Sequence, residues 1–225
     1  MTKILDKGEV ILVDSMAGDH KPIGAARIST GKRPEDALRG NDTDRHLLET
    51  LMTGGHGSPF EHAVFQWYVK APLFVIREWQ RHRMASYNEQ SGRYAKFKSE
   101  FYFPDHVRVQ DPNNKQSSVV SDDETLFREY REAVELATGD AFERYAKLLE
   151  HGVAREMARI VLPLNLYSSF WFTVNARSLM NFLMLRNALG AQFEIQEYAR
   201  ALEADFAALM PWTHEIFVAN GRKAP

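Results

Sequence analysis

The chain of 225 residues contains no cysteine. This absence excludes disulfide bonds, thiolate metal sites and a catalytic cysteine, so chemistry that normally uses a thiolate must follow another route. The sequence also lacks an apolar run approaching the roughly 20 residues of a membrane-spanning helix, and its start lacks the pattern of a secretory signal. These absences predict a cytoplasmic protein with no membrane partner.

An excess of positive charge is also missing. The chain has 28 Lys and Arg residues against 30 Asp and Glu residues, which gives a formal net charge of -2. This balance argues against bulk binding of nucleic acid. A hydrophobic content of 44% is that of an ordinary globular protein, and the length suits one large domain, which we expect to span residues 1–225.

Several familiar motifs are absent as well. The sequence contains no G-x-G-x-x-G, no phosphate-binding P-loop, no G-x-S-x-G and no H-E-x-x-H. A Rossmann dinucleotide site and the common phosphoryl, acyl and zinc-hydrolase sites are therefore not indicated. Any arginine-rich ligand site must use another architecture.

Periodicity predicts a helix-rich α+β fold with a mixed or antiparallel sheet. A Ser121–Glu124 capping box is expected to start the longest helix, the Thr138-Gly139 pair to interrupt it, and Gly190 to end a later one. Residues 30–42 read as a loop, and 101–118 as extended chain running into a polar loop. Strands are expected at 8–13, 62–72 and 166–175, and helices after Pro22 as far as residue 30, at 43–52, 73–82, 124–151, 153–160, 176–189 and 191–210, and after 211.

Two segments are candidates for ligand binding. The string RHRMASYNEQSGRY, residues 81–94, is either a solvated loop or an anion site built from guanidinium and hydroxyl groups. The string GGHGSPFEH, residues 54–62, is either a phosphate-contacting turn or a plain connection between a helix and a strand. The spacing of His56, His62 and His82 does not place two of them on one face, so no metal site is expected.

Three further arginine patterns stay ambiguous on the residues alone. Arg155 and Arg159 share one helix face, which is typical of a surface salt-bridge face. Arg177 and Asn181 share a face of an apolar helix, where they are either hydrogen-bonded in the core or in contact with a ligand. Arg186 lies about 140° around the helix from Asn181. It is therefore either unrelated to Asn181 or part of a site built across subunits.

The sequence resembles the flavin-dependent thymidylate synthase family. The resemblance starts from Arg81-His82-Arg83, which is followed after seven residues by Ser91, and it extends along most of the chain. The other matching strings, in order, are AARIS at 25–29, GHGSPFEH at 55–62, ARIVLPLNLY at 158–167, NARSLMNFL at 175–183 and LRNALGAQFEIQEYA at 185–199.

The resemblance implies the thymidylate synthase complementing protein fold and a homotetramer with sites at subunit junctions. It implies reductive methylation of dUMP to dTMP, with 5,10-methylenetetrahydrofolate as one-carbon donor and NADPH as reductant through bound FAD. Shared sites would account for Arg186. The absence of cysteine fits too, because the unrelated cysteine-dependent thymidylate synthases add a thiolate to the uracil ring.

The resemblance also assigns residues, with Arg186 as the catalytic residue and no metal ligand. The residues implied for dUMP are Glu78, Arg81, Glu89, Gln90, Ser91, Gly92, Arg93, Arg159 and Arg186. The residues implied for FAD are Ser29, His56, Ser58, Arg81, His82, Arg83, Glu89, Asn175, Arg177 and Asn181.

One position departs from the family pattern. Residue 78 is Glu where relatives usually have Gln, and a carboxylate near a phosphorylated substrate repels it unless an arginine pairs with it. Two alternatives to the enzyme remain: a catalytically silent module that binds nucleotides or RNA through 81–94, and a family member that has lost activity.

Overall fold

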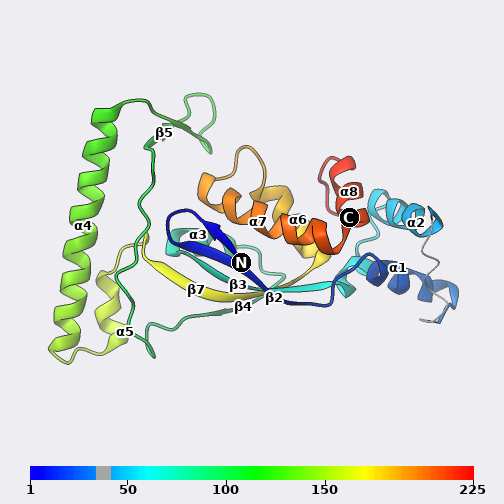
Figure 1. Ribbon diagram of the computed structural model, residues 1–225, viewed down its shortest axis with the longest axis horizontal. Coiled ribbons are helices and arrows are strands. Elements are labelled where there is room, and N and C mark those ends of the chain that lie inside the picture. Colours follow the sequence, from blue (N-terminus) through cyan, green and yellow to red (C-terminus); the bar gives the residue numbers. More distant parts are fainter. Residues whose placement is uncertain (34–41) are drawn as a thin grey trace.

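The computed structural model describes residues 1–33 and 42–225, and in these ranges the fold is α+β (Figure 1). Its main sheet has the strand order β1-β2-β3-β7-β4, and every neighbouring pair is antiparallel. The strands are β1 (Thr2–Ile4), β2 (Gly8–Ser15), β3 (Val64–Pro72), β4 (Ser86–Glu89) and β7 (Tyr167–Asn175). The open choice between a mixed and an antiparallel sheet is therefore settled as antiparallel.

The strand alternation decides which face of the sheet enters the core. In β3, Phe65, Trp67 and Val69 are fully buried, and β3 pairs with β7 along its whole length. Helices α6 (Ala176–Arg186) and α7 (Phe193–Leu209) lie along this face, as Figure 1 shows. The indole Nε1 of Trp67 donates to Asp205 of α7 at 2.8 Å, which satisfies a buried donor. One hydrophobic cluster joins the sheet to these helices.

The opposite face of the sheet carries polar and half-exposed side chains. Gln66 donates to Thr173 at 3.0 Å, and the Tyr68 hydroxyl donates to Ser169 at 2.8 Å. Trp171 of β7 is 41% exposed. In the described part of the chain no helix is packed over this face, which therefore remains open in the single chain.

The remaining elements lie at the two ends of the sheet (Figure 1). The long helix, the short helix that follows it and a small hairpin stand at one end. The first two helices of the chain and the last one gather near the C-terminus at the other end, whereas α3 follows β3 directly. The bounds are α1 (His20–Arg27), α2 (Asp42–Thr53), α3 (Leu73–Trp79), α4 (Glu124–Glu150), α5 (Arg155–Ala158), α8 (Pro211–Ala219), β5 (Arg108–Gln110), β6 (Ser118–Val120) and the 3-10 turns η1 (Ile28–Thr30), η3 (Ser58–His62) and η4 (Arg159–Val161).

Most predicted elements are present, and four details were wrong. Helix α4 runs through Gly139 without a break, and its cap is Asp123, whose carboxylate accepts from two backbone N–H groups, rather than Ser121. Helix α6 ends at Arg186, before Gly190. The segment read as extended chain and polar loop contains β5 and leads into β6, which pair as an unpredicted hairpin, and residues 81–94 contain the unpredicted strand β4. Residues 34–41 of the expected loop lie outside the described residues.

A buried carboxylate ties the C-terminal elements together. Glu203 of α7 accepts from the Asn187 amide at 2.5 Å, contacts His214 of α8 at 2.9 Å and pairs with Arg222 beyond α8. Burial alone would raise the pKa of Glu203, but the hydrogen bonds from Arg222, His214 and Asn187 hold it below its ordinary value. This cluster anchors the chain directly after Arg186. Within the described residues no helix is long and apolar enough to cross a membrane.

Candidate functional site

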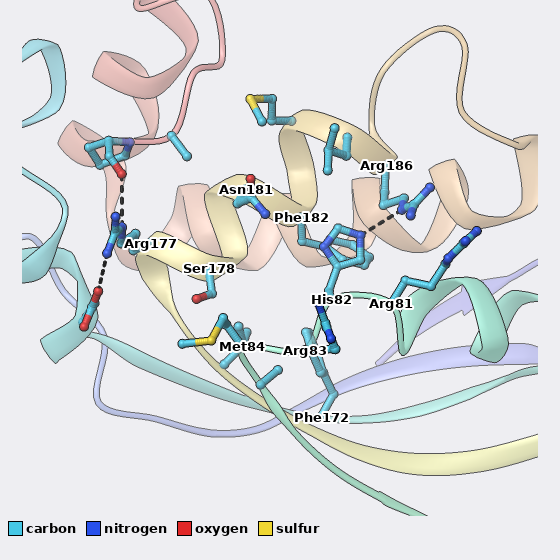
Figure 2. A pocket seen from close by; sticks show the side chains of 17 residues that line it. Arg81, His82, Arg83, Met84, Phe172, Arg177, Ser178, Asn181, Phe182 and Arg186 are labelled. Atoms are coloured by element: carbon cyan, nitrogen blue, oxygen red, sulfur yellow. Dashed lines mark hydrogen bonds and ion pairs between the residues drawn. The ribbon is translucent and has the colours of Figure 1, made fainter. Parts of the chain in front are cut away.

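A cavity of about 840 Å³ runs along helix α6 (Figure 2). Arg177 lies at one end, Arg186 at the other and Asn181 between them. The segment that follows α3 contributes Arg81 and His82. The helix geometry argues against one small ligand meeting both Asn181 and Arg186, yet both residues line this single cavity.

At one end of the cavity a guanidinium lies between an imidazole and a carboxylate. Arg186 Nε donates to His82 Nε2 at 2.9 Å, and Arg186 Nη1 pairs with Glu78 Oε1. Burial and the neighbouring positive charge of Arg186 lower the pKa of His82 to about 4. His82 is therefore neutral at pH 7, and its Nε2 lone pair accepts the hydrogen bond. Its ring meets Phe182 edge-on at a centroid distance of 4.8 Å.

At the other end, Arg177 is held by the glycine-rich turn. Arg177 Nη1 pairs with Glu61 at 2.6 Å, and Nε donates to the backbone oxygen of Pro225 at 3.1 Å. A Cβ at Gly57 would stand 2.3 Å from Arg177 Nε, so only glycine allows this approach. The segment 54–62 therefore supports the cavity through Gly57 and Glu61 rather than through its histidines.

A second group of predicted residues lies at the end of β4. A Cβ at Gly92 would stand 3.0 Å from Arg159 Cδ, which places the loop after β4 against η4. Arg93 Nε pairs with Glu156 at 2.9 Å, and the Ser91 hydroxyl accepts from the Arg93 backbone N–H at 3.2 Å. None of these residues is among those that line the 840 Å³ cavity. The structure thus divides the predicted site into two groups.

Glu89 and Gln90 connect the two groups. Glu89 accepts from Gln80, the residue before Arg81, at 3.3 Å and from the buried Ser168 hydroxyl at 2.9 Å. Gln90 lines a smaller cavity of about 380 Å³. Strand β4 holds this arrangement because it pairs with β7.

Besides these two groups, five further predicted residues do not line the main cavity. Ser29 donates to the Ala26 carbonyl at 2.7 Å, and His56 and Ser58 are exposed. Asn175 caps α6, since its side-chain oxygen accepts from the Ser178 backbone N–H at 2.8 Å. Glu78 contacts the cavity only through Arg186.

Other lining residues were not singled out from the sequence. Glu61 and Ser178 add polar groups, and Phe172 and Phe182, which also belong to the buried core, add aromatic rings. The segment after α3 also contributes Met84, which follows the predicted Arg83. In the ranges that the structure describes, no group of His, Asp or Glu side chains is arranged to hold a metal ion.

Comparisons with known proteins agree on one family. The family model described as Thymidylate synthase complementing protein matches residues 11–212. The chain is 49% identical to a flavin-dependent thymidylate synthase of Thermosipho africanus over 216 residues, 96% of this chain and 93% of that protein. It is 47% identical to one of Thermus thermophilus over 201 residues, 88% of this chain and 71% of that protein.

A solved structure gives the same result for the fold. The crystal structure of a UMP/dUMP methylase PolB from Streptomyces cacaoi, bound with 5-Br dUMP, matches with a TM-score of 0.90 and 39% sequence identity. The match covers 100% of both chains. A second structure of that methylase, bound with 5-Br UMP, matches with a TM-score of 0.87.

Proposed function

The chain belongs to the thymidylate synthase complementing protein family and is a flavin-dependent thymidylate synthase, which converts dUMP to dTMP, and we propose that the 840 Å³ cavity along α6 binds its FAD. The observation that carries this assignment is the convergence of cationic and polar side chains on one elongated cavity. They are Arg81, His82, Arg83, Arg177, Asn181 and Arg186.

The cavity suits the chemistry of this cofactor. Guanidinium groups recognise a diphosphate through charge-assisted hydrogen bonds, and the Phe172 and Phe182 rings offer apolar surface to an aromatic ring system. When bound, the flavin supplies the reducing equivalents, which we propose come from NADPH. Ser29, His56, Ser58 and Asn175 stay weaker candidates because they do not line the cavity.

We assign the nucleotide phosphate to the loop after β4. Ser91 offers a hydroxyl, Gly92 a backbone amide and Arg93 a guanidinium group, and Arg159 offers a second guanidinium group from the neighbouring η4. The methylase PolB, which shares this fold, was crystallised with 5-Br dUMP. Glu89 and Gln90 would lie between this phosphate site and the cavity.

Arg186 activates the pyrimidine ring for the chemical step. Uracil is a poor nucleophile at carbon 5. A guanidinium against the ring stabilises negative charge at nitrogen 3, and this charge makes carbon 5 nucleophilic enough to attack an electrophilic methylene. The methylene donor that we propose is 5,10-methylenetetrahydrofolate. Neutral His82 keeps Arg186 in place without competing for its charge.

The active form that we propose is a homotetramer with shared sites, in which residues 1–225 act as one domain. In one chain the residues assigned to the nucleotide phosphate lie apart from the cavity along α6, so a second copy of the chain can complete each site. Exposed apolar side chains next to Arg159 support a subunit contact there. They are Met157, Ile160, Val161 and Leu164.

The proposal has a direct test. Purified protein should be yellow or bind added FAD, and it should release tritium from dUMP labelled at carbon 5 only when the folate and NADPH are both present. Protein that is colourless when purified and does not bind added FAD would contradict the assignment of the cavity. Steeply salt-dependent RNA binding without tritium release would instead support the RNA-binding alternative, against which the net charge of -2 argues.

A glycine in the turn gives a second prediction. Gly57→Ala should weaken FAD binding roughly 10- to 100-fold, because the added Cβ displaces Arg177 from a charge-assisted contact. Titration with FAD measures the effect. Gly139→Ala in α4 is the matched control, since a Cβ there meets nothing within 4 Å, and it should bind FAD like the parent. Equal affinities in the two variants would contradict a role of Arg177 in FAD binding.

A further inference from the structure

We propose that Tyr87 is a positioning residue for FAD binding, whose hydroxyl group holds residues 81–85 in the conformation that lines the cavity. This inference rests on the proposed binding of FAD in that cavity. It adds a residue that acts on the cofactor through the backbone of its neighbours.

The first support is the position of the Tyr87 hydroxyl group. It donates to the backbone oxygen of His82 at 2.7 Å and lies 3.2 Å from the backbone oxygen of Trp79. The backbone N–H of His82 donates to the same Trp79 oxygen at 3.0 Å. The hydroxyl group of Tyr87 therefore joins strand β4 to the end of α3 across the residues that lie between them.

The second support is the segment that this hydrogen bond closes. Arg83, Met84 and Ala85 line the cavity, and Arg81 and His82 line it directly before them. Among the described residues, none donates to or accepts from the backbone of Arg83, Met84 or Ala85. The conformation of these three residues therefore depends on how the two ends of the segment are held, and the bond from Tyr87 to His82 connects those ends.

The third support is that the ring of Tyr87 is placed independently of its hydroxyl group. Tyr87 lies opposite Phe172 where β4 pairs with β7, and its ring packs on those of Phe172 and Phe170 at centroid distances of 5.4 and 6.1 Å. Burial raises the pKa of the Tyr87 hydroxyl above its ordinary value, so at neutral pH the group stays protonated and can donate. Tyr87→Phe therefore removes the hydrogen bond and keeps the packing.

The hydrogen bond from Tyr87 completes the placement of His82. Arg186 Nε donates to the ring of His82 at 2.9 Å, whereas Tyr87 holds the backbone oxygen of the same residue. A segment that already has its ligand-bound conformation loses less conformational entropy when the ligand binds, and this raises the affinity. Loss of the Tyr87 hydroxyl group is therefore expected to weaken FAD binding.

Two tyrosine variants test this role. Tyr87→Phe should raise the Kd for FAD roughly 10-fold, which is the usual effect of losing one hydrogen bond. Tyr198→Phe is the matched control, because it removes a buried hydroxyl group that donates to the backbone oxygen of Lys70 at 2.7 Å. The control should also lower the thermal unfolding midpoint of the FAD-free protein, but it should bind FAD like the parent. Titration with FAD measures the three affinities.

The outcomes separate positioning from general stability. An equal loss of FAD affinity in both variants would show that the affinity only follows the stability of the fold. Parental FAD affinity in Tyr87→Phe would show that the hydroxyl group does not position the residues that line the cavity. Either result would overturn the proposal.

Amide hydrogen exchange in the FAD-free protein keeps the inference separate from the proposed function. The backbone N–H of His82 should exchange roughly 10-fold faster in Tyr87→Phe than in the parent, and at the parental rate in Tyr198→Phe. An unchanged rate in Tyr87→Phe would contradict the positioning role whatever the FAD affinity. A parent that shows this exchange pattern but does not bind FAD would instead contradict the proposed function alone.

Discussion

Replacing Arg186 with alanine is expected to lower kcat roughly 100- to 1,000-fold, the usual effect of removing one group that stabilises charge in a transition state. FAD should still bind, because Arg81, His82 and Arg177 remain in the cavity. The measurements are tritium release under saturating substrates and the flavin absorbance of the purified variant. Parental turnover in this variant would show that another residue supports the uracil anion.

The structure requires one control for this experiment. Arg186→Ala removes the ion-pair partner of Glu78, whose carboxylate is mostly shielded from water. The unpaired carboxylate is expected to destabilise the end of α3. The double variant Arg186→Ala/Glu78→Gln removes that charge and should be as inactive as the single variant while unfolding at the parental temperature. Recovery of turnover in the double variant would show that the lone carboxylate, and not the missing guanidinium, caused the loss.

Replacing Arg93 with alanine is expected to raise the dUMP KM roughly 10- to 100-fold, because the variant loses a charge-assisted hydrogen bond to the phosphate. The turnover number at saturating dUMP should change little, since the phosphate does not react. Stability should also change little, because the Arg93–Glu156 pair is more than half exposed on the arginine side, and such pairs contribute about 1 kcal/mol at most. Initial-rate kinetics over a range of dUMP concentrations measures both constants.

Two further variants test the specificity of that effect. Arg144→Ala removes an exposed arginine that pairs with Asp140 on α4, and its dUMP KM should equal that of the parent. Glu156→Ala releases Arg93 from its carboxylate partner and should keep the KM at or below the parental value. A parental KM in Arg93→Ala would support the interpretation of residues 81–94 as a solvated loop.

Local patterns were sufficient for much of the fold. The alternation of Phe65, Trp67 and Val69 predicted β3, and apolar spacing predicted the long helices, because burial on one face decides both. Strand β4 was missed because its sequence, SYNE, has only one aromatic residue among polar ones, although the burial of its side chains alternates. Its conformation depends on pairing with β7, far away in the sequence. The hairpin of β5 and β6 has short, mostly exposed strands, so its sequence carries little periodic signal.

The site was predictable in its parts but not in its geometry. The Arg81-His82-Arg83 string pointed to an anion site, and the structure places all three residues on one cavity. The pairing of Glu78 with Arg186 and the approach of Gly57 to Arg177 could not be predicted, because both join segments about a hundred residues apart. The angle of about 140° between Asn181 and Arg186 around the helix argued against a single site for a small ligand. Both residues line one elongated cavity, so the angle does not exclude a shared site for a longer ligand.

The Glu203 cluster couples the stability of three segments in the C-terminal part of the chain. Asn187, His214 and Arg222 come from three separate segments, and each contributes to keeping one buried carboxylate ionised. If one segment detaches, the Glu203 carboxylate keeps fewer partners and its burial becomes less favourable. The contacts with the remaining segments are then weakened as well. We therefore expect the end of α6, helix α8 and the residues after it to open together in local unfolding, with Arg186 at the border of that unit.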